Sequence, residues 1–497
     1  MKALQIQQLG IAPIEWNSDA DPFTAVLEFI TSVVFVSITF GENGESRLPL
    51  IVVWLVSAAV FFTTYLGFMN IRGFKHAIDL VRGRFSKPED AGEVSHFQAL
   101  ATAVSGTVGL GNIAGVAVAI SLGGPGATFW MIAAGFLGMS SKLAECILGV
   151  KYRRRHADGS VSGGPMYYLR DGVAALGKPG LGKVLAAAFA VFCILGSLGG
   201  GNMFQSNQAT LQLLDVTGAD ADNKLLAFGI GAVFAAIVGS VILGGIKSIA
   251  RVTEKVVPLM AVIYVSACLI VILGNLGQVP TAFGDIIAGA FNPEGIAGGM
   301  VGVLIVGFQR AAFSNEAGVG SASIAHSAVK TEEPSTEGHV ALLEPFIDTI
   351  VICTMTALTI VITGVWNDPE AADGDGVRLT SRAFESVIPW FPNVLAIAVV
   401  LFALSTMLSW SYYGMKATGY LFGDNPVAEN VYKVVFCGFT ILGSGLALNA
   451  VLGFSDAAIF LMSIPNVIGL YLLARVLKGE LSQYREKVRT GEFARVK

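Results

Sequence analysis

The residues Gly106–Asn112, GTVGLGN, interrupt an apolar stretch without charged residues that runs from Ala99 to Leu122. The stretch is long enough to cross a bilayer, but its glycines, Thr107 and Asn112 favour a break in the helix. Inside a membrane, backbone N–H and C=O groups leave a helix only where they line a cavity. The pattern therefore indicates either an unwound segment that offers these groups to an ion or a polar molecule, or glycines that let neighbouring helices pack closely.

A second group of polar residues interrupts the apolar run from Met300 to Gly320. Its members are Gln309, Arg310, Ser314, Asn315 and Glu316. Each ionisable group at membrane depth costs at least ~2.5 kcal/mol on insertion scales, so such groups usually face a cavity or a partner. We expect a second break here; the alternative is a span that ends near Phe313 and leaves the polar residues in a loop. Two such interruptions are typical of the binding site of an inverted-repeat transporter.

Amide and hydroxyl side chains in two other apolar runs are candidates to complete a site. Asn202 and Gln205 are three residues apart, so they share one face of a helix. Ser405 and Thr406 supply hydroxyl oxygens, which are hard ligands suited to an alkali cation, and Trp410 follows on the face of Thr406. The alternative is that the amides bond only to neighbouring helices and the hydroxyls to carbonyl groups of their own helix.

Four charged residues lie at the expected ends of two spans. Glu344 and Asp348 open the eighth expected span, which is centred near Met355. Lys142 and Glu145 close the third, which is centred near Gly135. We interpret them mainly as interface residues or ion pairs, with a proton relay through Asp348 as a less favoured alternative. In the outer halves of their spans, Arg310 and Asp456 are candidates to pair as an external gate.

The composition is typical of a helical membrane protein. Of 497 residues, 54% are hydrophobic and only 14% are charged, against about 25% in a typical soluble domain. Apolar runs of about 20 residues recur, and we expect about eleven membrane crossings. Their centres lie near Ala58, Gly109, Gly135, Gly196, Ala235, Ser266, Phe308, Met355, Phe402, Ile441 and Met462. For Phe23–Phe40, which carries Glu28 and many β-branched residues, we favour a helix that lies in the membrane interface.

Lys and Arg predict the orientation, because cytoplasmic loops carry an excess of these residues. Basic residues recur in alternate loops, as in Lys151–Arg155, and in the tail from Arg475, whereas residues 275–297 include neither Lys nor Arg. We therefore place the N-terminus outside and the C-terminus in the cytoplasm, in a bacterial-type inner (plasma) membrane. The expected organisation is a periplasmic segment over residues 1–48, a transmembrane domain over 49–475 and a cytoplasmic tail over 476–497.

Several other classes of protein are not expected. Gly109–Ala114 matches the dinucleotide fingerprint G-x-G-x-x-A, but that fingerprint needs a preceding strand and a soluble βαβ unit. The five cysteines form no C-x-x-C pair, so neither a disulfide framework nor a zinc site is expected. We find no paired carboxylates, metal-ligand spacing or nucleophile with its base, so we do not expect an enzyme. We expect no nucleic-acid partner and infer no obligate protein partner.

Four segments are similar to those of the alanine/glycine:cation symporter family, the sodium:alanine symporters. They are Gly123–Met131, which resembles the family's signature, Glu93–Gly115, Phe313–Gly320 with its FSNEAG core, and Leu404–Gly414. The resemblance runs from about Val52 to the final span, whereas the N-terminal 45 residues are atypical. It implies an all-α, LeuT-type fold of five plus five inverted helices, here preceded by one extra N-terminal helix.

The resemblance also implies a binding site. The segment Val108–Asn112 is similar to the unwound first core helix of the neurotransmitter:sodium symporters, where N–H groups meet the carboxylate of an amino acid. A half-helix N-terminus has the free donors and the positive dipole end that a carboxylate needs. The implied substrate residues are Thr107, Leu110, Gly111, Asn112, Gln205, Phe313, Asn315, Thr406 and Trp410. The implied sodium ligands are the carbonyls of Ser105 and Val108 and oxygens of Phe402, Ser405 and Thr406.

The function that the resemblance implies is sodium-driven symport of small neutral amino acids, alanine or glycine, into the cell by alternating access. Sodium bound between Ser105, Val108 and Thr406 would tie the broken helix to the ninth span, and Phe313 and Trp410 would keep the pocket small. Proton-driven symport on the same fold, through Glu316 or Asp348, is the nearest alternative. A channel is a more distant one.

Overall fold

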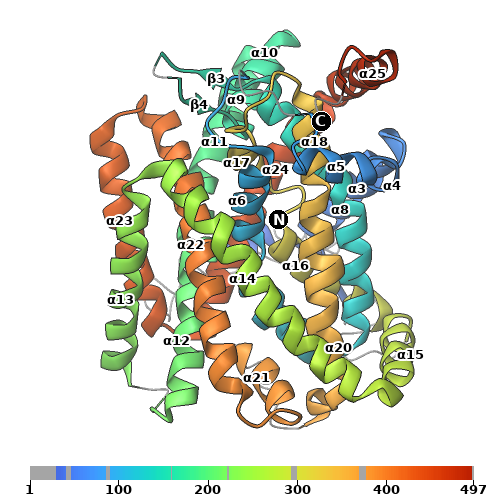
Figure 1. The fold of residues 1–497 in the computed structure, drawn as a ribbon, viewed down its shortest axis with the longest axis vertical. Coiled ribbons are helices and arrows are strands. Elements are labelled where there is room, and N and C mark those ends of the chain that lie inside the picture. Colours follow the sequence, from blue (N-terminus) through green and yellow to red (C-terminus); the bar gives the residue numbers. More distant parts are fainter. Residues whose placement is uncertain are drawn as a thin grey trace, which may run out of the picture.

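Long helices that run between two ends of the molecule dominate the computed structural model (Figure 1). The structure describes residues 29–40, 46–85, 90–157, 159–220, 223–292, 299–368 and 376–494. The first half of the chain forms α3 (Leu50–Tyr65), α4 (Met69–Arg72), α5 (Phe74–Val81), α6 (His96–Thr107), η1 (Gly111–Gly115), α7 (Val116–Gly123), α8 (Gly126–Lys151), α9 (Pro165–Tyr167), η2 (Tyr168–Gly172), α10 (Val173–Ala175), α11 (Pro179–Leu198), η3 (Gly199–Met203), α12 (Phe204–Thr217) and α13 (Lys224–Ile242).

The second half forms α14 (Gly245–Gly274), η4 (Leu276–Gln278), α15 (Val279–Ala290), α16 (Gly299–Asn315), α17 (Ala322–His326), α18 (Pro334–Ala341), α19 (Leu343–Pro345), η5 (Phe346–Cys353), α20 (Thr354–Thr363), η6 (Val365–Asn367), α21 (Val377–Glu385), α22 (Phe391–Phe422), α23 (Pro426–Gly445), α24 (Leu448–Leu472) and α25 (Ala474–Thr490). Two short antiparallel hairpins complete the described chain, β1 (Ser37–Phe40) with β2 (Ser46–Pro49) and β3 (Arg154–Arg155) with β4 (Val161–Ser162).

The long apolar helices confirm a multi-pass membrane protein. Within the described residues, seven helical stretches are long and apolar enough to cross a bilayer, or eight when a bent pair of helices is counted as one span. Of the eleven expected centres, ten lie inside helices and Gly109 lies at the bend of that pair. The count of eleven crossings and the five-plus-five repeat stay predictions.

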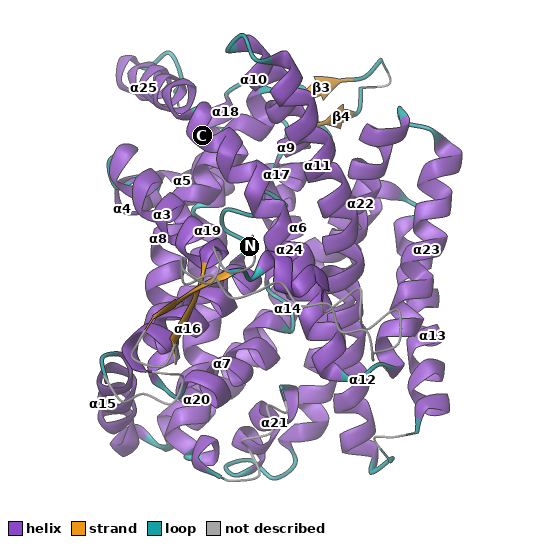
Figure 2. Cartoon of the chain, turned by 180° about the vertical axis from the view of Figure 1, so that it is seen from behind, coloured by secondary structure: helices purple, strands orange, loops and turns teal. Residues whose placement is uncertain are grey.

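The prediction for the segment Phe23–Phe40 needs a correction. Residues 23–28 lie outside the described part of the chain, and residues 29–34 are helical, but Ser37–Phe40 is a strand paired with Ser46–Pro49. Ile38 and Thr39 are β-branched, and such residues fit a pleated strand better than a helix. The second strand packs beside α16 (Figure 2). The segment is therefore not one interfacial helix, and most of the proposed unit 1–48 lies outside the described residues.

Several segments that carry Lys and Arg lie toward one end of the molecule. Figure 1 shows α5, α25 and the β3–β4 hairpin toward one end and α15 and α21 at the other. The C-terminal helix α25 buries Leu477, Leu481 and Tyr484, and the Tyr484 hydroxyl lies 2.7 Å from Nε2 of His76 in α5. Residues 476–490 of the expected tail are thus helical and dock beside α5.

Three spans contain a π-helical turn where they pass one another in the core. These turns are η1, η3 and η5, and most of their residues are buried. A π-helical turn widens the hydrogen-bond ladder of a helix, and such turns are frequent at functional sites. The fold thus brings irregular backbone from three spans into the interior, where the candidate site is found.

Candidate functional site

The break predicted near Gly109 is present. Helix α6 ends at Thr107, η1 begins at Gly111, and the two helical pieces are bent by 50°. Side chains supply partners for the N–H groups released at the break: Gly109 N donates to Asn112 Oδ1 at 2.9 Å, and Leu110 N donates to Gln205 Oε1 at 3.0 Å. Because N–H groups in the first turn of a helix have no partner within that helix, the start of η1 is a place where an oxygen can bind.

Hydrogen bonds connect four of the five residues predicted to bind sodium, which lie in α6 and in the middle of α22. Thr406 Oγ1 donates to the Ser105 carbonyl oxygen at 2.9 Å, and Ser105 Oγ donates to the Ser405 carbonyl oxygen at 2.7 Å. Ser405 Oγ in turn donates to the Phe402 carbonyl oxygen at 2.9 Å. Val108 is the residue directly after the end of α6. Carbonyl and hydroxyl oxygens from two spans thus adjoin the break, which is the donor set that a hard cation requires.

Gly109 lies where the cation-binding and substrate-binding predictions meet. A Cβ atom at this position would lie 2.3 Å from Thr406 Oγ1 and 3.0 Å from Gln205 Oε1. A Cβ atom at Gly111 would lie 3.6 Å from the ring of Phe313. The absence of side chains at these glycines lets α12, α16 and α22 approach the bare backbone closely.

Two aromatic residues, Phe313 and Trp410, lie beside this region. Phe313 packs against Phe204 with ring centroids 5.1 Å apart, and Trp410 packs against Tyr413 at 5.4 Å. Both rings contact the glycine-rich turn η3: a Cβ atom at Gly200 would lie 3.4 Å from the Phe313 ring, and one at Gly201 would lie 2.2 Å from Trp410 Cγ. Phe313 is 5% exposed and Trp410 is 1% exposed, so the region is closed to solvent.

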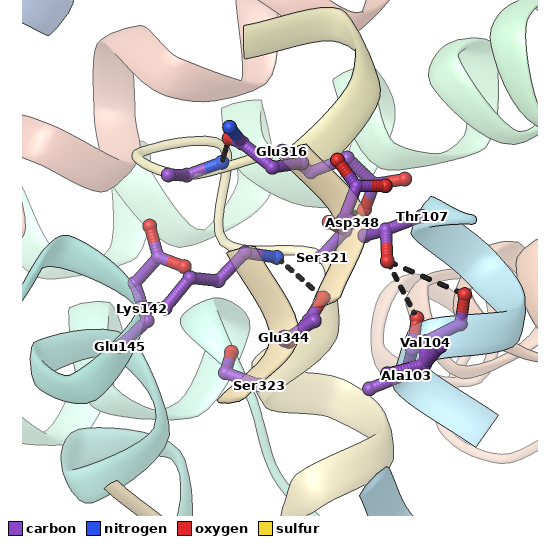
Figure 3. Close-up of polar contacts among 12 residues, drawn as sticks. Ala103, Val104, Thr107, Lys142, Glu145, Glu316, Ser321, Ser323, Glu344 and Asp348 are labelled. Carbon is purple, nitrogen blue, oxygen red and sulfur yellow. Dashed lines mark hydrogen bonds and ion pairs between the residues drawn. The ribbon is translucent and has the colours of Figure 1, made fainter. Parts of the chain in front are cut away.

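Three of the predicted substrate residues are engaged elsewhere. Asn112 donates to Asp348 Oδ2 at 2.7 Å, and Thr107 Oγ1 lies 3.3 Å from the carbonyl oxygens of Ala103 and Val104 (Figure 3). Asn315 donates to Thr349 Oγ1 at 2.9 Å.

Asn315 also borders a cavity that is lined by Leu55 and Gly138. It follows Phe313 by two residues, which places the two side chains on nearly opposite faces of α16. We therefore leave Asn315 out of the substrate site proposed below.

The prediction of interface residues or ion pairs is half right: the four charged residues are buried and do not lie at an interface, but an ion pair is present. The residues are Lys142, Glu145, Glu344 and Asp348. All four are 0% exposed. The expected ion pair does form, because Lys142 Nζ lies 2.9 Å from Glu344 Oε1 (Figure 3). The span begins at Pro334, not near Glu344. Hydropathy alone did not reveal this early start, because 334–345 is polar and yet buried.

Asp348 joins the two broken spans. Its carboxylate accepts hydrogen bonds from Asn112 beside the first break and from Ser314 Oγ, at 2.8 Å, beside the second. The second break is present: α16 ends at Asn315, and Glu316 adopts a left-handed φ of +56°. Earlier in α16, before the break, Arg310 forms the expected ion pair with Asp456. Gln309 donates to the same carboxylate at 3.3 Å. A role of this pair as a gate stays a prediction.

The architecture defines the chain as a helical membrane protein with the LeuT fold. The overall fold is similar to that of MhsT, whose crystal structure is a complex with L-phenylalanine, with a TM-score of 0.54. That similarity covers 77% of this chain and 89% of MhsT at 19% sequence identity, and it therefore concerns the fold alone.

Sequence comparison then gives the family. The chain belongs to the sodium:alanine symporter family, whose family model matches residues 35–497. The sodium/alanine symporter AgcS of Methanococcus maripaludis is 41% identical over 453 residues, which cover 91% of this chain and 98% of that protein. The amino-acid carrier protein AlsT of Bacillus subtilis is 32% identical over 457 residues, which cover 90% and 93%. The family expected from the four sequence segments is confirmed.

Proposed function

We propose that the protein carries a small neutral amino acid, alanine or glycine, together with sodium into the cell by alternating access. The observation that carries the proposal is the contact of Thr406 Oγ1 with the Ser105 carbonyl oxygen, directly beside the break in the second expected span. Membership of a family of sodium:alanine symporters supports the same ion and class of substrate. No covalent chemistry is required of the chain.

The carboxylate of the amino acid binds at the start of η1. The Leu110 N–H already donates to an oxygen, Gln205 Oε1, at 3.0 Å, which supports this N–H as a donor to a carboxylate oxygen. The positive dipole end of the half-helix favours the same charge. The rings of Phe313 and Trp410 then limit the size of the side chain that the site accepts.

Sodium binds to oxygens of Ser105, Val108, Phe402, Ser405 and Thr406. These residues belong to α6 and α22 or lie directly after α6, so the ion holds the broken span against its neighbour. An ion that orders the break also orders the N–H groups that receive the carboxylate. Each ligand therefore raises the affinity of the other by the same factor.

The test is uptake of radiolabelled alanine into proteoliposomes under an inward sodium gradient, with equal pH on both sides. We expect saturable accumulation with sodium and none when choline replaces it. Unlabelled alanine, glycine, serine and glutamine added as competitors rank the substrates. Flux that does not saturate with amino acid would instead indicate a channel.

A second candidate, proton-coupled symport, is favoured by one observation. The Asp348 carboxylate accepts from residues beside both breaks and is fully buried, so adding a proton to it would change both contacts. The same proteoliposomes separate the two candidates. Alanine accumulation that is driven by an imposed pH gradient in the absence of sodium supports proton-coupled symport. Alanine accumulation that does not change with the pH gradient excludes it.

A further inference from the structure

Glu316 is a buried acid that the proposed transport cycle does not use. It follows the last residue of α16, at the second break, and is 2% exposed. Both carboxylate oxygens have partners: Oε2 accepts from the Ser321 hydroxyl, and Oε1 accepts from the Trp410 indole N–H at 3.0 Å. The side chain thus links the second broken span to α22.

The Trp410 indole is held at both ends. On one side it packs against η3, where a Cβ atom at Gly201 would lie 2.2 Å from Trp410 Cγ. Near its far edge, a Cβ atom at Gly196 would lie 3.4 Å from Trp410 Cζ3. A tryptophan side chain has two torsion angles, and packing together with one hydrogen bond is enough to restrict both.

The ring stands beside the proposed substrate site. Trp410 follows Thr406 by four residues, so the two side chains lie on the same face of α22. The same turn η3 that supports the indole also contacts Phe313 and receives a hydrogen bond, from Gln205 Nε2 to the Gly200 carbonyl oxygen at 2.9 Å. A shift of the indole would therefore change the space available next to the Leu110 N–H.

We propose that Glu316 is a positioning residue that holds the Trp410 indole in place and so limits the size of the amino-acid side chain that the site accepts. The inference rests on the proposed function. Glu316 does not touch the substrate; it acts through Trp410.

The hydrogen-bond acceptor and the charge of Glu316 can be separated. Glu316→Gln keeps an acceptor oxygen for the indole and removes the charge, whereas Glu316→Leu removes the acceptor at similar volume. Trp410→Phe keeps a ring and removes the N–H donor. A purely structural role in satisfying a buried indole N–H predicts lower stability for Glu316→Leu without a change in substrate preference.

The experiment measures kcat/KM for sodium-driven uptake of alanine and of leucine in the full-length protein. We expect Glu316→Leu and Trp410→Phe each to reduce the preference for alanine about tenfold, mainly through a lower KM for leucine. The double variant should lose no more than either single variant, because both changes break one contact. Glu316→Gln should retain most of the preference. The matched control is Ser411→Ala, which removes a buried hydroxyl bonded to the Leu408 carbonyl oxygen of its own helix.

Three results would overturn the inference: an unchanged preference in Trp410→Phe, additive losses in the double variant, or a loss in Glu316→Gln as large as in Glu316→Leu. If Glu316→Leu does not fold, Trp410→Phe and Glu316→Gln still decide the matter. A different result would contradict the proposed function itself: uptake of neither amino acid by the wild-type protein in a sodium gradient.

Discussion

Thr406 connects the two helices to which the proposed sodium site is assigned, because its hydroxyl donates to the Ser105 carbonyl oxygen at 2.9 Å. In the proposed function a sodium ion binds both oxygens, and the Thr406 hydroxyl keeps its proton but turns it away from the Ser105 carbonyl oxygen. If Thr406 acts through this one oxygen atom, removing the atom should weaken sodium binding and leave the fold intact.

Thr406→Ala should therefore raise the sodium concentration for half-maximal alanine uptake by roughly tenfold or more, as expected for loss of one oxygen that contacts a charge. The measurement is uptake against sodium concentration in proteoliposomes. The control is Thr418→Ala on the same helix, where the hydroxyl donates only to the Gly414 carbonyl oxygen at 2.8 Å. A wild-type sodium dependence in Thr406→Ala would remove this residue from the site.

A second prediction for a single residue concerns Gly109. Gly109→Ala should reduce uptake at least tenfold, because its Cβ atom would lie 2.3 Å from Thr406 Oγ1 and overpacking at a buried site costs about 1–3 kcal/mol. Gly115→Ala in the same broken span is the control, since a Cβ atom there meets no other group within 4 Å. Equal uptake by the two variants would show that the close approach at Gly109 is unimportant.

At the scale of the elements, Glu337 fastens the ends of both broken spans. Its carboxylate pairs with His96, the first residue of α6, and with His326 Nδ1, the last residue of α17, at 2.5 Å. His326 Nε2 lies 3.6 Å from Glu344 and so extends this buried cluster toward Lys142. One side chain in α18 thus secures two half-helices that the proposed cycle must move.

Replacing this carboxylate should destabilise the protein strongly. Glu337→Gln removes one partner of a buried ion pair, which costs roughly 3 kcal/mol. Glu332→Gln is a matched control, because the Glu332 side chain is 50% exposed and its pair with Arg155 should contribute less than about 1 kcal/mol. The measurement is the unfolding temperature of both variants in the same detergent. Similar temperatures would contradict the assigned role of Glu337.

The sequence predicted the positions of the helices along the chain better than it predicted which way their polar side chains point. Apolar length identified the spans, and Gly109 and Gly111 identified the first break, because both signals are local. The direction of the Asn315 side chain is not set by the local sequence, because it depends on the rotation of α16 relative to its neighbours. The burial of Glu344 and Asp348 was missed for a similar reason, since hydropathy assigns polar residues to surfaces, whereas partners such as Lys142 come from distant parts of the chain.

At the scale of the whole molecule, the distribution of basic loops predicts an orientation that labelling can test. Helices α15 and α25 lie at opposite ends of the molecule (Figure 1). Leu276, in η4 directly before α15, and Thr490, the last residue of α25, are both exposed. With native cysteines replaced, Leu276→Cys should react with a membrane-impermeant maleimide on intact cells. Thr490→Cys should react only after permeabilisation. The reverse pattern would invert the proposed topology and the direction of coupling.

The central claim is that one interrupted helix binds the amino acid and the ion together, and the binding equilibrium tests it most directly. Calorimetric titration of the detergent-solubilised protein with alanine, at several sodium concentrations, and with sodium, at several alanine concentrations, measures both couplings. The account predicts that each ligand raises the affinity of the other by one common factor, and that Thr406→Ala lowers this factor toward one. Alanine binding of equal affinity with and without sodium would contradict the account.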